Sequence, residues 1–319
     1  MGEWYNSANT ANERGYVRRI HKHRLWGFTA VIGFLLGSMA APPAMAQEPK
    51  RITILYDAFG AEAGALEMDW GFAALVEYGG KRILFDTGND GQILARNVKQ
   101  LLSDLTRLDA AVISHRHGDH TSGLNHLLEV NPRVKIYAPA ESAFFKSPIP
   151  RAFLTRYDTL PVDMQYYRGK EPTRFVSGTP WENANFEVIA KTTEIFPGFI
   201  IITTQSQKAG TMEMNELSLA FRTPQGLVVV VGCSHPGVEK ILENAATIEP
   251  RIYTVAGGFH LVLAPRPEIE RVASMLHDTL KVQRVAPGHC TGELGFSVFM
   301  ERFKDRYDRA GLGAVISLP

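Results

Sequence analysis

The sequence predicts an α/β fold in which two β-sheets pack together and helices lie outside them. Two observations lead to this prediction. Short apolar runs typical of strands form two groups, and helical periodicity follows the strands of each group. No long polar linker interrupts these runs, so residues 47–319 are expected to form one large domain. Elements of this kind and order suit packed layers around a hydrophobic core.

The first group of elements lies before residue 140. Strands are predicted at 51–56, 72–78, 82–86, 110–114 and 134–138, and a helix at 90–104. The second and third strands form a hairpin that turns at Gly79-Gly80, a dipeptide typical of tight turns. A capped helix is expected to begin near Thr121, shortly after the fourth strand.

The second group begins at residue 199. Strands are predicted at 199–204, 216–222, 226–232, 251–256 and 282–287, and helices at 238–246, 267–279 and 295–306. Residues 140–195, between the groups, are less periodic and rich in aromatic residues and prolines. Two interpretations of this insertion stand side by side: it covers or walls the functional site, or it is a peripheral structural loop. Loops on rigid scaffolds often determine the ligand, so the first interpretation places substrate selection here.

Residues 1–46 have the pattern of a secretory signal peptide. Five basic residues between positions 14 and 24 precede an uncharged stretch, Leu25–Ala46, which ends in the A-x-A cleavage site Ala44-Met45-Ala46. Cleavage there predicts an exported, periplasmic protein that begins at Gln47 and has no stable membrane insertion. The alternative is an uncleaved membrane anchor, since the apolar part of this stretch approaches the length of a membrane span.

Charge limits the class of partner. Residues 1–46 hold five of the 34 basic residues and two of the 33 acidic residues, so the rest of the chain has a net charge of about −2. Nucleic-acid binders usually have a basic stripe, and none is visible here. The expected partner is therefore a small-molecule substrate and not a nucleic acid, and these features leave the oligomeric state undetermined.

Residues 115–120, His-Arg-His-Gly-Asp-His, form the densest functional motif of the chain. They place four metal-ligand side chains, His115, His117, Asp119 and His120, on one loop after a buried strand. Buried histidine and aspartate are costly unless they are paired or bind a metal. On a tight loop the first two histidines can face one ion while Asp119 and His120 face a second. The motif therefore predicts a metal centre with two ions about 3.5–4 Å apart.

Three later histidines share one context, because each follows a predicted strand and is framed by glycines that allow close backbone approach. His235 and His289 are expected to be metal ligands. His260 is expected either to bind metal or to contact the substrate. Asp86, in an Asp-Thr-Gly turn at the end of a strand, could accept a hydrogen bond from a ligand histidine or hold the metal loop.

The two cysteines of the chain, Cys233 and Cys290, each lie close to one of these histidines. Three interpretations are open for them. They could form a disulfide in an exported protein, bind a metal as thiolates, or be small residues of the core.

The order of these motifs resembles that of the metallo-β-lactamase fold superfamily. Within it, the segments 232–235, 257–261 and 287–292 are similar to one branch, which comprises metal-dependent hydrolases resembling the archaeal dihydropterin-ribofuranosylaminobenzene-phosphate synthase. The resemblance covers about residues 51–310. It implies an αββα sandwich with the metals at one edge of the two sheets.

The resemblance also implies roles for single residues. Its central motif matches His115, His117, Asp119 and His120, and its last metal histidine matches His289. Many members have an earlier histidine, and an acidic bridging ligand where Cys233 and His235 stand. Either His235 takes the role of that histidine or the second site is built differently, with Cys233 or His260 completing it.

The leading functional prediction is a hydrolase that uses a metal-activated water on a small-molecule ester, lactone, amide or phosphoester. Asp119 would bind metal and orient the nucleophile, and His260 would contact the substrate or leaving group. Two zinc ions are favoured by the affinity order, with manganese or iron as alternatives that depend on availability. Two other functions remain: a pterin-synthase-like transferase, and a non-catalytic metal-dependent ligand-binding or sensor protein.

Overall fold

A computed structural model describes residues 48–60, 64–141 and 183–319, and between the last two ranges Phe144, 147–148, Thr155, 157–172, 176–177 and Trp181. All of these residues belong to one compact unit, residues 47–319. The signal peptide expected at residues 1–46 lies outside the described residues. None of the helices in the described part has the length and apolar character needed to cross a membrane.

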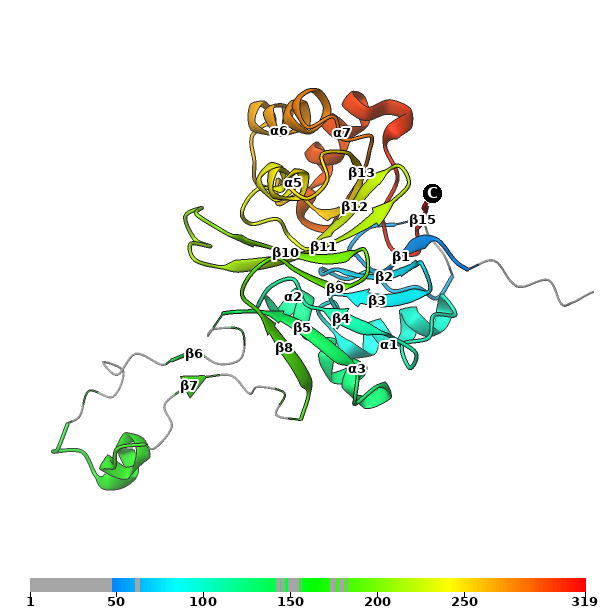
Figure 1. The fold of residues 1–319 in the computed structure, drawn as a ribbon. Coiled ribbons are helices and arrows are strands. Elements are labelled where there is room, and N and C mark those ends of the chain that lie inside the picture. Colours follow the sequence, from blue (N-terminus) through cyan, green and yellow to red (C-terminus); the bar gives the residue numbers. More distant parts are fainter. Residues whose placement is uncertain are drawn as a thin grey trace, which may run out of the picture. The chain divides into compact units, whose positions relative to one another are not determined.

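The first sheet has the strand order β15-β1-β2-β3-β4-β5-β8 (Figure 1). Its strands are β1 (Arg51–Tyr56), β2 (Ala73–Tyr78), β3 (Lys81–Phe85), β4 (Ala110–Val112), β5 (Lys135–Pro139), β8 (Asn185–Ile189) and β15 (Val315–Ser317). The hairpin expected around Gly79-Gly80 joins β2 to β3. From β3 to β8 the strands run parallel, so β3, β4 and β5 end at the same edge of the sheet.

The second sheet has the order β14-β13-β12-β11-β10-β9. Its strands are β9 (Thr193–Phe196), β10 (Phe199–Gln205), β11 (Asn215–Thr223), β12 (Gly226–Val231), β13 (Ile252–Gly258) and β14 (Arg284–Gly288). Strands β12, β13 and β14 are parallel, with Val231 opposite Gly257 and Gly257 opposite Pro287. A separate short hairpin pairs β6 (Ser147–Pro148) with β7 (Val176–Ser177).

Helices cover the outer face of each sheet (Figure 1). They are α1 (Gly91–Gln100), α3 (Leu124–Val130), α5 (Val238–Ala246), α6 (Arg266–Ser274) and α7 (Glu293–Phe303), whereas the short helix α2 (Gly118–Thr121) lies in the loop after β4. Shorter helical turns are η2 (Val162–Met164), η3 (Tyr166–Gly169), η4 (Met275–Thr279), η5 (His289–Thr291) and η6 (Lys304–Arg306). One apolar cluster joins the first sheet to α1 and α3, another fills the space between the sheets, and a third joins the second sheet to α5, α6 and α7. The predicted αββα sandwich is therefore confirmed.

Strand β12 shows why the sequence folds into four layers. Its side chains alternate, so that Val228 and Val230 join the core between the sheets while Val229 and Val231 join the helical layer. All four valines are fully buried. Full burial of one such side chain contributes about 1.5–3 kcal/mol relative to exposure. A continuous apolar run, instead of an alternating one, is what a strand covered on both faces requires.

The structure differs from the sequence-based expectations at three edges. The insertion expected over 140–195 ends earlier, because β8 and β9 already belong to the two main sheets. Strand β8 was not predicted because most of its side chains are exposed or half-buried, as suits an edge strand, and the pattern is therefore weak. Strand β15 has only three residues, paired to β1, and was not predicted either.

Candidate metal centre

The metal loop follows β4 and is fixed by Asp86, which stands at the end of the neighbouring strand β3. The Asp86 carboxylate accepts hydrogen bonds from Ser114 N at 2.6 Å and Ser114 Oγ at 2.7 Å. It also contacts His120 Nδ1 at 2.7 Å. One buried carboxylate therefore holds the start of the loop and orients a histidine near its end, as in the outer shell of many metal sites.

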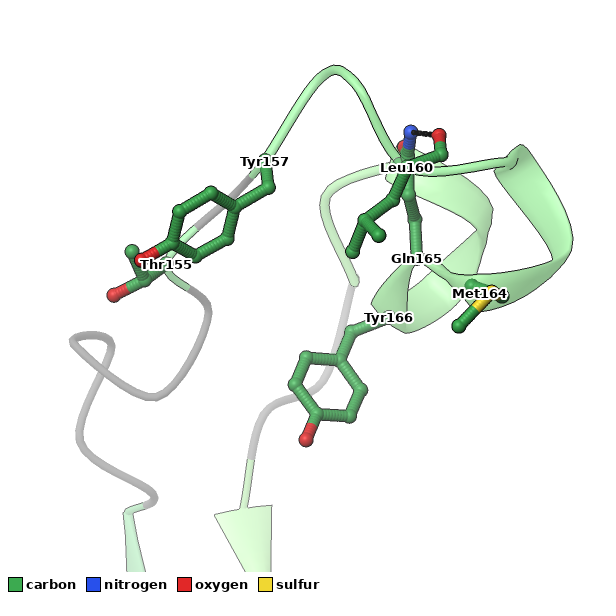
Figure 2. A pocket seen from close by; sticks show the side chains of 7 residues that line it. Thr155, Tyr157, Leu160, Met164, Gln165 and Tyr166 are labelled. Carbon is green, nitrogen blue, oxygen red and sulfur yellow. Dashed lines mark hydrogen bonds between the residues drawn. The ribbon is translucent and has the colours of Figure 1, made fainter.

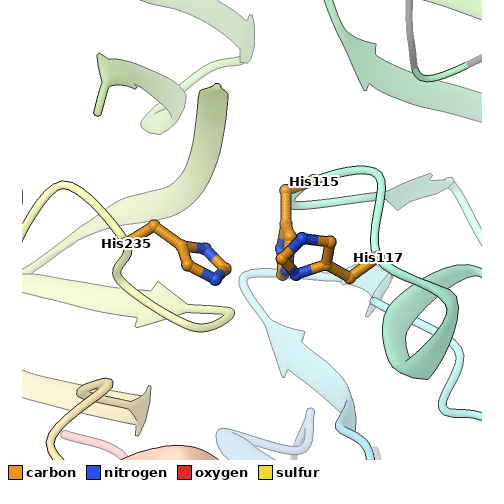
Figure 3. A group of neighbouring side chains, drawn as sticks. All are labelled: His115, His117 and His235. Carbon is orange, nitrogen blue, oxygen red and sulfur yellow. The ribbon is translucent and has the colours of Figure 1, made fainter. Parts of the chain in front are cut away.

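The first ligand group consists of His115, His117 and His235, whose ligand atoms lie within 4.8 Å of one another. The first two come from the metal loop and His235 comes from the loop after β12, so that rings from the two sheets face each other (Figure 3). His115 Nε2 lies 3.1 Å from His117 Nδ1. Burial and the neighbouring histidines hold the pKa of His115 well below its ordinary value and lower that of His117 to about 4. At His115 and His117 this favours the neutral imidazole, which is the form that binds a cation.

The second group consists of Asp119, His120 and His289, also within 4.8 Å of one another. Asp119 Oδ2 lies 3.4 Å from His289 Nε2 and 3.7 Å from His120 Nε2. Burial opposes ionisation of Asp119, but the close approach of His289 and His120 outweighs this effect and lowers the pKa of Asp119. Both ring nitrogens of His289 are buried without a hydrogen-bond partner. An unsatisfied buried polar group costs about 1–3 kcal/mol, so a metal ion bound through Nε2, which faces Asp119, fits as a missing partner of this ring.

Cys233 lies between the two groups. Its Sγ is 3.2 Å from His120 Nε2, and it forms a further set of converging ligand atoms with His115 and His120. Both cysteines are free and buried, so the disulfide that the sequence left open is absent. The two ligand groups are therefore adjacent, and a thiol stands where they meet.

His260 lies outside both groups. It is solvent-exposed and follows β13, with its ring centroid 4.4 Å from that of His235. A hydrogen bond with Cys290 raises its pKa. The structure thus places it at the rim of the centre, next to Cys233 and Cys290.

Two carboxylates that support the centre were missed in the sequence. Glu216 of β11 is fully buried and accepts hydrogen bonds from the backbone N–H of Cys233, Ser234 and His235 at 3.0, 2.6 and 2.8 Å. It also contacts His235 Nδ1 at 3.0 Å. Asp57, directly after β1, accepts from His289 N at 3.0 Å. The sequence feature that could have revealed them is an acidic residue at the start of an apolar strand or directly after one, since such a residue is rarely buried without partners.

Four residues of the candidate centre have strained backbone conformations. Positive φ angles occur at Asp86, Ser234, His260 and His289, with values of 57, 63, 50 and 46°. Such conformations cost about 1–3 kcal/mol each in non-glycine residues and persist where the surroundings enforce them.

Both described ends of the insertion contact elements next to the metal loop. Arg116, between the first two histidines, pairs with Glu141, and Trp181 Nε1 donates to Asn125 Oδ1 at 3.0 Å. Further out, the insertion has a small cavity of its own, of about 300 Å³, lined by side chains such as Tyr157, Leu160 and Tyr166 (Figure 2). None of the metal-centre residues lines that cavity. Trp70, which is 46% exposed, lies closer to the centre, with its ring 5.0 Å from that of His289.

Comparisons with known proteins agree with this geometry. A family model described as a beta-lactamase superfamily domain matches residues 81–144. The chain is 32% identical to 7,8-dihydropterin-6-methyl-4-(beta-D-ribofuranosyl)-aminobenzene-5'-phosphate synthase of Methanocaldococcus jannaschii over 251 residues, which are 74% of this chain and 84% of the synthase. It is 28% identical to an uncharacterized protein of the same archaeon over 228 residues, 70% of this chain and 84% of that protein.

A solved structure gives the same fold. The crystal structure of Tm1679, a metal-dependent hydrolase of the beta-lactamase superfamily, superposes with a TM-score of 0.63. The sequences are 25% identical, and the match covers 84% of this chain and 98% of Tm1679.

Proposed function

Since the chain belongs to the metallo-β-lactamase superfamily, we propose that it is a metal-dependent hydrolase with two adjoining metal positions. One observation supports this most strongly. Ligand side chains from separate loops of both sheets form two groups that meet at Cys233. A structural histidine cluster would need hydrogen-bond partners for its buried nitrogens, and His289 has none.

The proposal assigns the following roles to the residues. His115, His117 and His235 would hold one ion, and Asp119, His120 and His289 the other, with Cys233 between them. A bound metal would supply Lewis acidity and a water of lowered pKa. Asp86 and Glu216 orient the rings of His120 and His235 through their Nδ1 atoms, which leaves Nε2 free to face the ions. His260, exposed at the rim, is placed to contact the substrate or to give a proton to the leaving group.

Imidazole, carboxylate and thiol together form a donor set that suits zinc better than magnesium or calcium. We therefore propose zinc at both positions. The test is to purify the full chain, measure bound metal by mass spectrometry, and screen esters, lactones, phosphodiesters and a cephalosporin before and after chelation. Turnover of at least one class that disappears on chelation and returns with zinc is expected. Full metal loading without hydrolysis of any class would overturn the proposal.

A second candidate is a synthase-like group transfer, which the identity to the archaeal synthase favours. The test is to supply a reduced pterin with an activated 6-methyl group together with a ribofuranosylaminobenzene phosphate. A joined product detected by liquid chromatography and mass spectrometry would favour transfer, whereas consumption of either compound with water alone would favour hydrolysis. Tight metal binding with neither reaction would favour a sensor.

We also propose that residues 1–46 direct export and that the mature chain begins at Gln47. The order of a basic segment, an apolar segment and an A-x-A site supports this export proposal. N-terminal sequencing of the protein from a bacterial periplasmic fraction tests it, and recovery of the intact N-terminus in the membrane fraction would contradict it.

A further inference from the structure

A third set of ligand atoms lies beside the two groups assigned above. Cys233 Sγ, Cys290 Sγ and a ring nitrogen of His260 all lie within 4.8 Å of one another. The three residues come from different loops, after β12, β13 and β14. Both thiols are buried, whereas His260 is exposed, so the set opens to solvent on one side. The proposed hydrolase uses Cys233 and His260 but gives no role to Cys290.

Hydrogen bonds fix these three loops to one another. Leu261 N and Val262 N, next to His260, both donate to Cys290 O at 3.1 Å. The Cys290 thiol lies 3.5 Å from Cys233 O and donates to it. Gly258 N donates to Gly232 O at 3.0 Å, which joins the ends of β13 and β12. The three side chains are therefore held together by the backbone before any ligand arrives.

Gly258 provides the space for the second thiol. A Cβ atom at this position would lie 2.8 Å from Cys290 Sγ and 2.5 Å from Gly232 O, closer than real Cβ contacts allow. The nearby His260 has a φ of 50°, a conformation that costs a non-glycine residue free energy. If these residues only filled space in the core, neither a glycine at position 258 nor a positive φ at His260 would be required. Together they bring an imidazole and two sulfur atoms to one point.

We propose that Cys233, His260 and Cys290 form a third metal position, for a thiophilic divalent cation such as zinc, at the rim of the centre. Two thiolates would offset most of the charge of the cation, which lowers the free-energy cost of its partial burial. Three protein ligands leave one tetrahedral position open towards solvent. Zinc bonds of about 2.3 Å to sulfur and 2.0–2.1 Å to nitrogen require ligand atoms roughly 3.3–3.8 Å apart, so small side-chain rotations from the present spacing close the site.

Cys233 links the third position to the proposed hydrolytic centre. Its Sγ also lies 3.2 Å from His120 Nε2, so its thiolate would be shared between neighbouring cations. The proposal thus rests on the proposed function for the two neighbouring positions, with which it shares Cys233. It gives His260 a metal-binding role in place of proton donation, and it adds Cys290 Sγ. A third cation there would raise metal content above two per chain and would add sulfur ligands to the spectrum.

The test is a cobalt(II) titration of the metal-free full chain, followed by absorption spectroscopy, for the wild type, Cys290→Ser and His260→Ala. The wild type is expected to bind one equivalent more than either variant. Sulfur-to-cobalt charge-transfer absorption should fall by about half in Cys290→Ser, because one of two thiolates is lost. The control is His277→Ala, which removes a histidine outside all ligand groups and should change neither quantity. Circular dichroism checks that each variant is folded. If Cys290→Ser does not fold, His260→Ala, at an exposed position, still tests whether one cobalt equivalent is lost.

Two results would overturn the third position. One is wild-type stoichiometry and full charge-transfer absorption in both folded variants. The other is a Cys233–Cys290 disulfide in the purified protein, found as a failure of maleimide to label the unfolded chain. Two equivalents that do not depend on Cys290 would leave the hydrolase proposal intact and remove only this one. Absence of any bound metal would remove both.

Discussion

The two sheets contribute to the candidate metal centre in different ways. The first sheet supplies His115, His117, Asp119 and His120 from one short loop after β4. The second supplies its candidate ligands one or two at a time, from the loops after three parallel strands between residues 233 and 290. Ligands that are adjacent in sequence can be recognised by spacing, whereas ligands that meet through strand register can be recognised only by their shared context. The loops of the second sheet also need more hydrogen bonds to hold their shape, and Glu216 and Asp57 accept these bonds. Glycines such as Gly232 and Gly258 allow the close backbone contacts.

The largest effect is expected from removing one ligand from each side, with His120→Ala and His289→Ala. Each should lose one metal equivalent and reduce kcat/KM by more than the roughly 100-fold typical of an outer hydrogen-bond partner. Metal analysis and rates on any substrate from the screen measure this, with His277→Ala as the control. If His289→Ala keeps full metal content and activity, His289 is not a metal ligand, and the histidines of the second sheet do not have the same role as those of the metal loop.

Next in size are the two supporting carboxylates. Asp86→Asn and Glu216→Gln should each weaken zinc binding by about 10–100-fold, because an amide orients the histidine less strongly and cannot accept all the hydrogen bonds. Competition with a coloured chelator measures the zinc affinity. A larger loss for Glu216→Gln is expected, since Glu216 also accepts three backbone N–H groups. Equal, negligible losses would show that the loops hold their shape without either carboxylate.

The two positions should also differ in pH dependence. Burial lowers the pKa of His120 and Asp86 raises it, with a net value of about 9, whereas that of His117 is about 4. His120 therefore keeps its proton below about pH 9, and a cation at the second position must displace it. In a Cys233→Ser background, affinity there should rise about tenfold per pH unit from pH 7 to 9. The first position, isolated with His289→Ala, should be nearly flat over this range in calorimetric titrations, and an equal slope at both positions would contradict the assignment.

A smaller effect, on stability, is expected where the loops of the two sheets are in contact. A Cβ at Gly232 would lie 2.2 Å from Ser114 Oγ and 3.0 Å from Asp86 Oδ2, so the loops of the two sheets are in direct contact here. Gly232→Ala should lower the free energy of unfolding by about 1–3 kcal/mol through overpacking. The matched control is Gly118→Ala on the metal loop, where the only close neighbour is Ser122 Oγ at 3.5 Å. Urea denaturation compares them, and equal stability would show that the contact is easily relieved.

The smallest effect on stability is expected in the insertion. Tyr166 is 72% exposed, so Tyr166→Ser should change the free energy of unfolding by less than about 0.5 kcal/mol. Its effect on KM is the informative quantity. A raised KM with unchanged kcat would support the interpretation that the insertion contacts the substrate, and unchanged kinetics would favour a peripheral loop.

Much of the fold followed from local pattern. The all-valine run of β12 and the helix at 238–246 were predicted within a residue because burial on both faces, or on one helical stripe, leaves a regular apolar signal. Strands β8, β9 and β15 were missed because edge strands are short or partly exposed and gain their stability from a partner distant in sequence. Helix α1 ends at Gln100, short of the expected 104, and Leu102 follows with a φ of 50°.

The sequence by itself predicted a metal loop, because four potential ligands within six residues have no ordinary structural explanation. It also predicted His235 and His289 as candidate ligands through their repeated strand-end context. Only the tertiary structure decided that His235 joins His115 and His117, that Cys233 stands between the two groups as a free thiol, and that Glu216 and Asp57 hold the loops. The physical reason is that these contacts depend on how parallel strands align at one edge and how two sheets face each other. Those alignments arise from packing of the whole core and leave no periodicity in the chain.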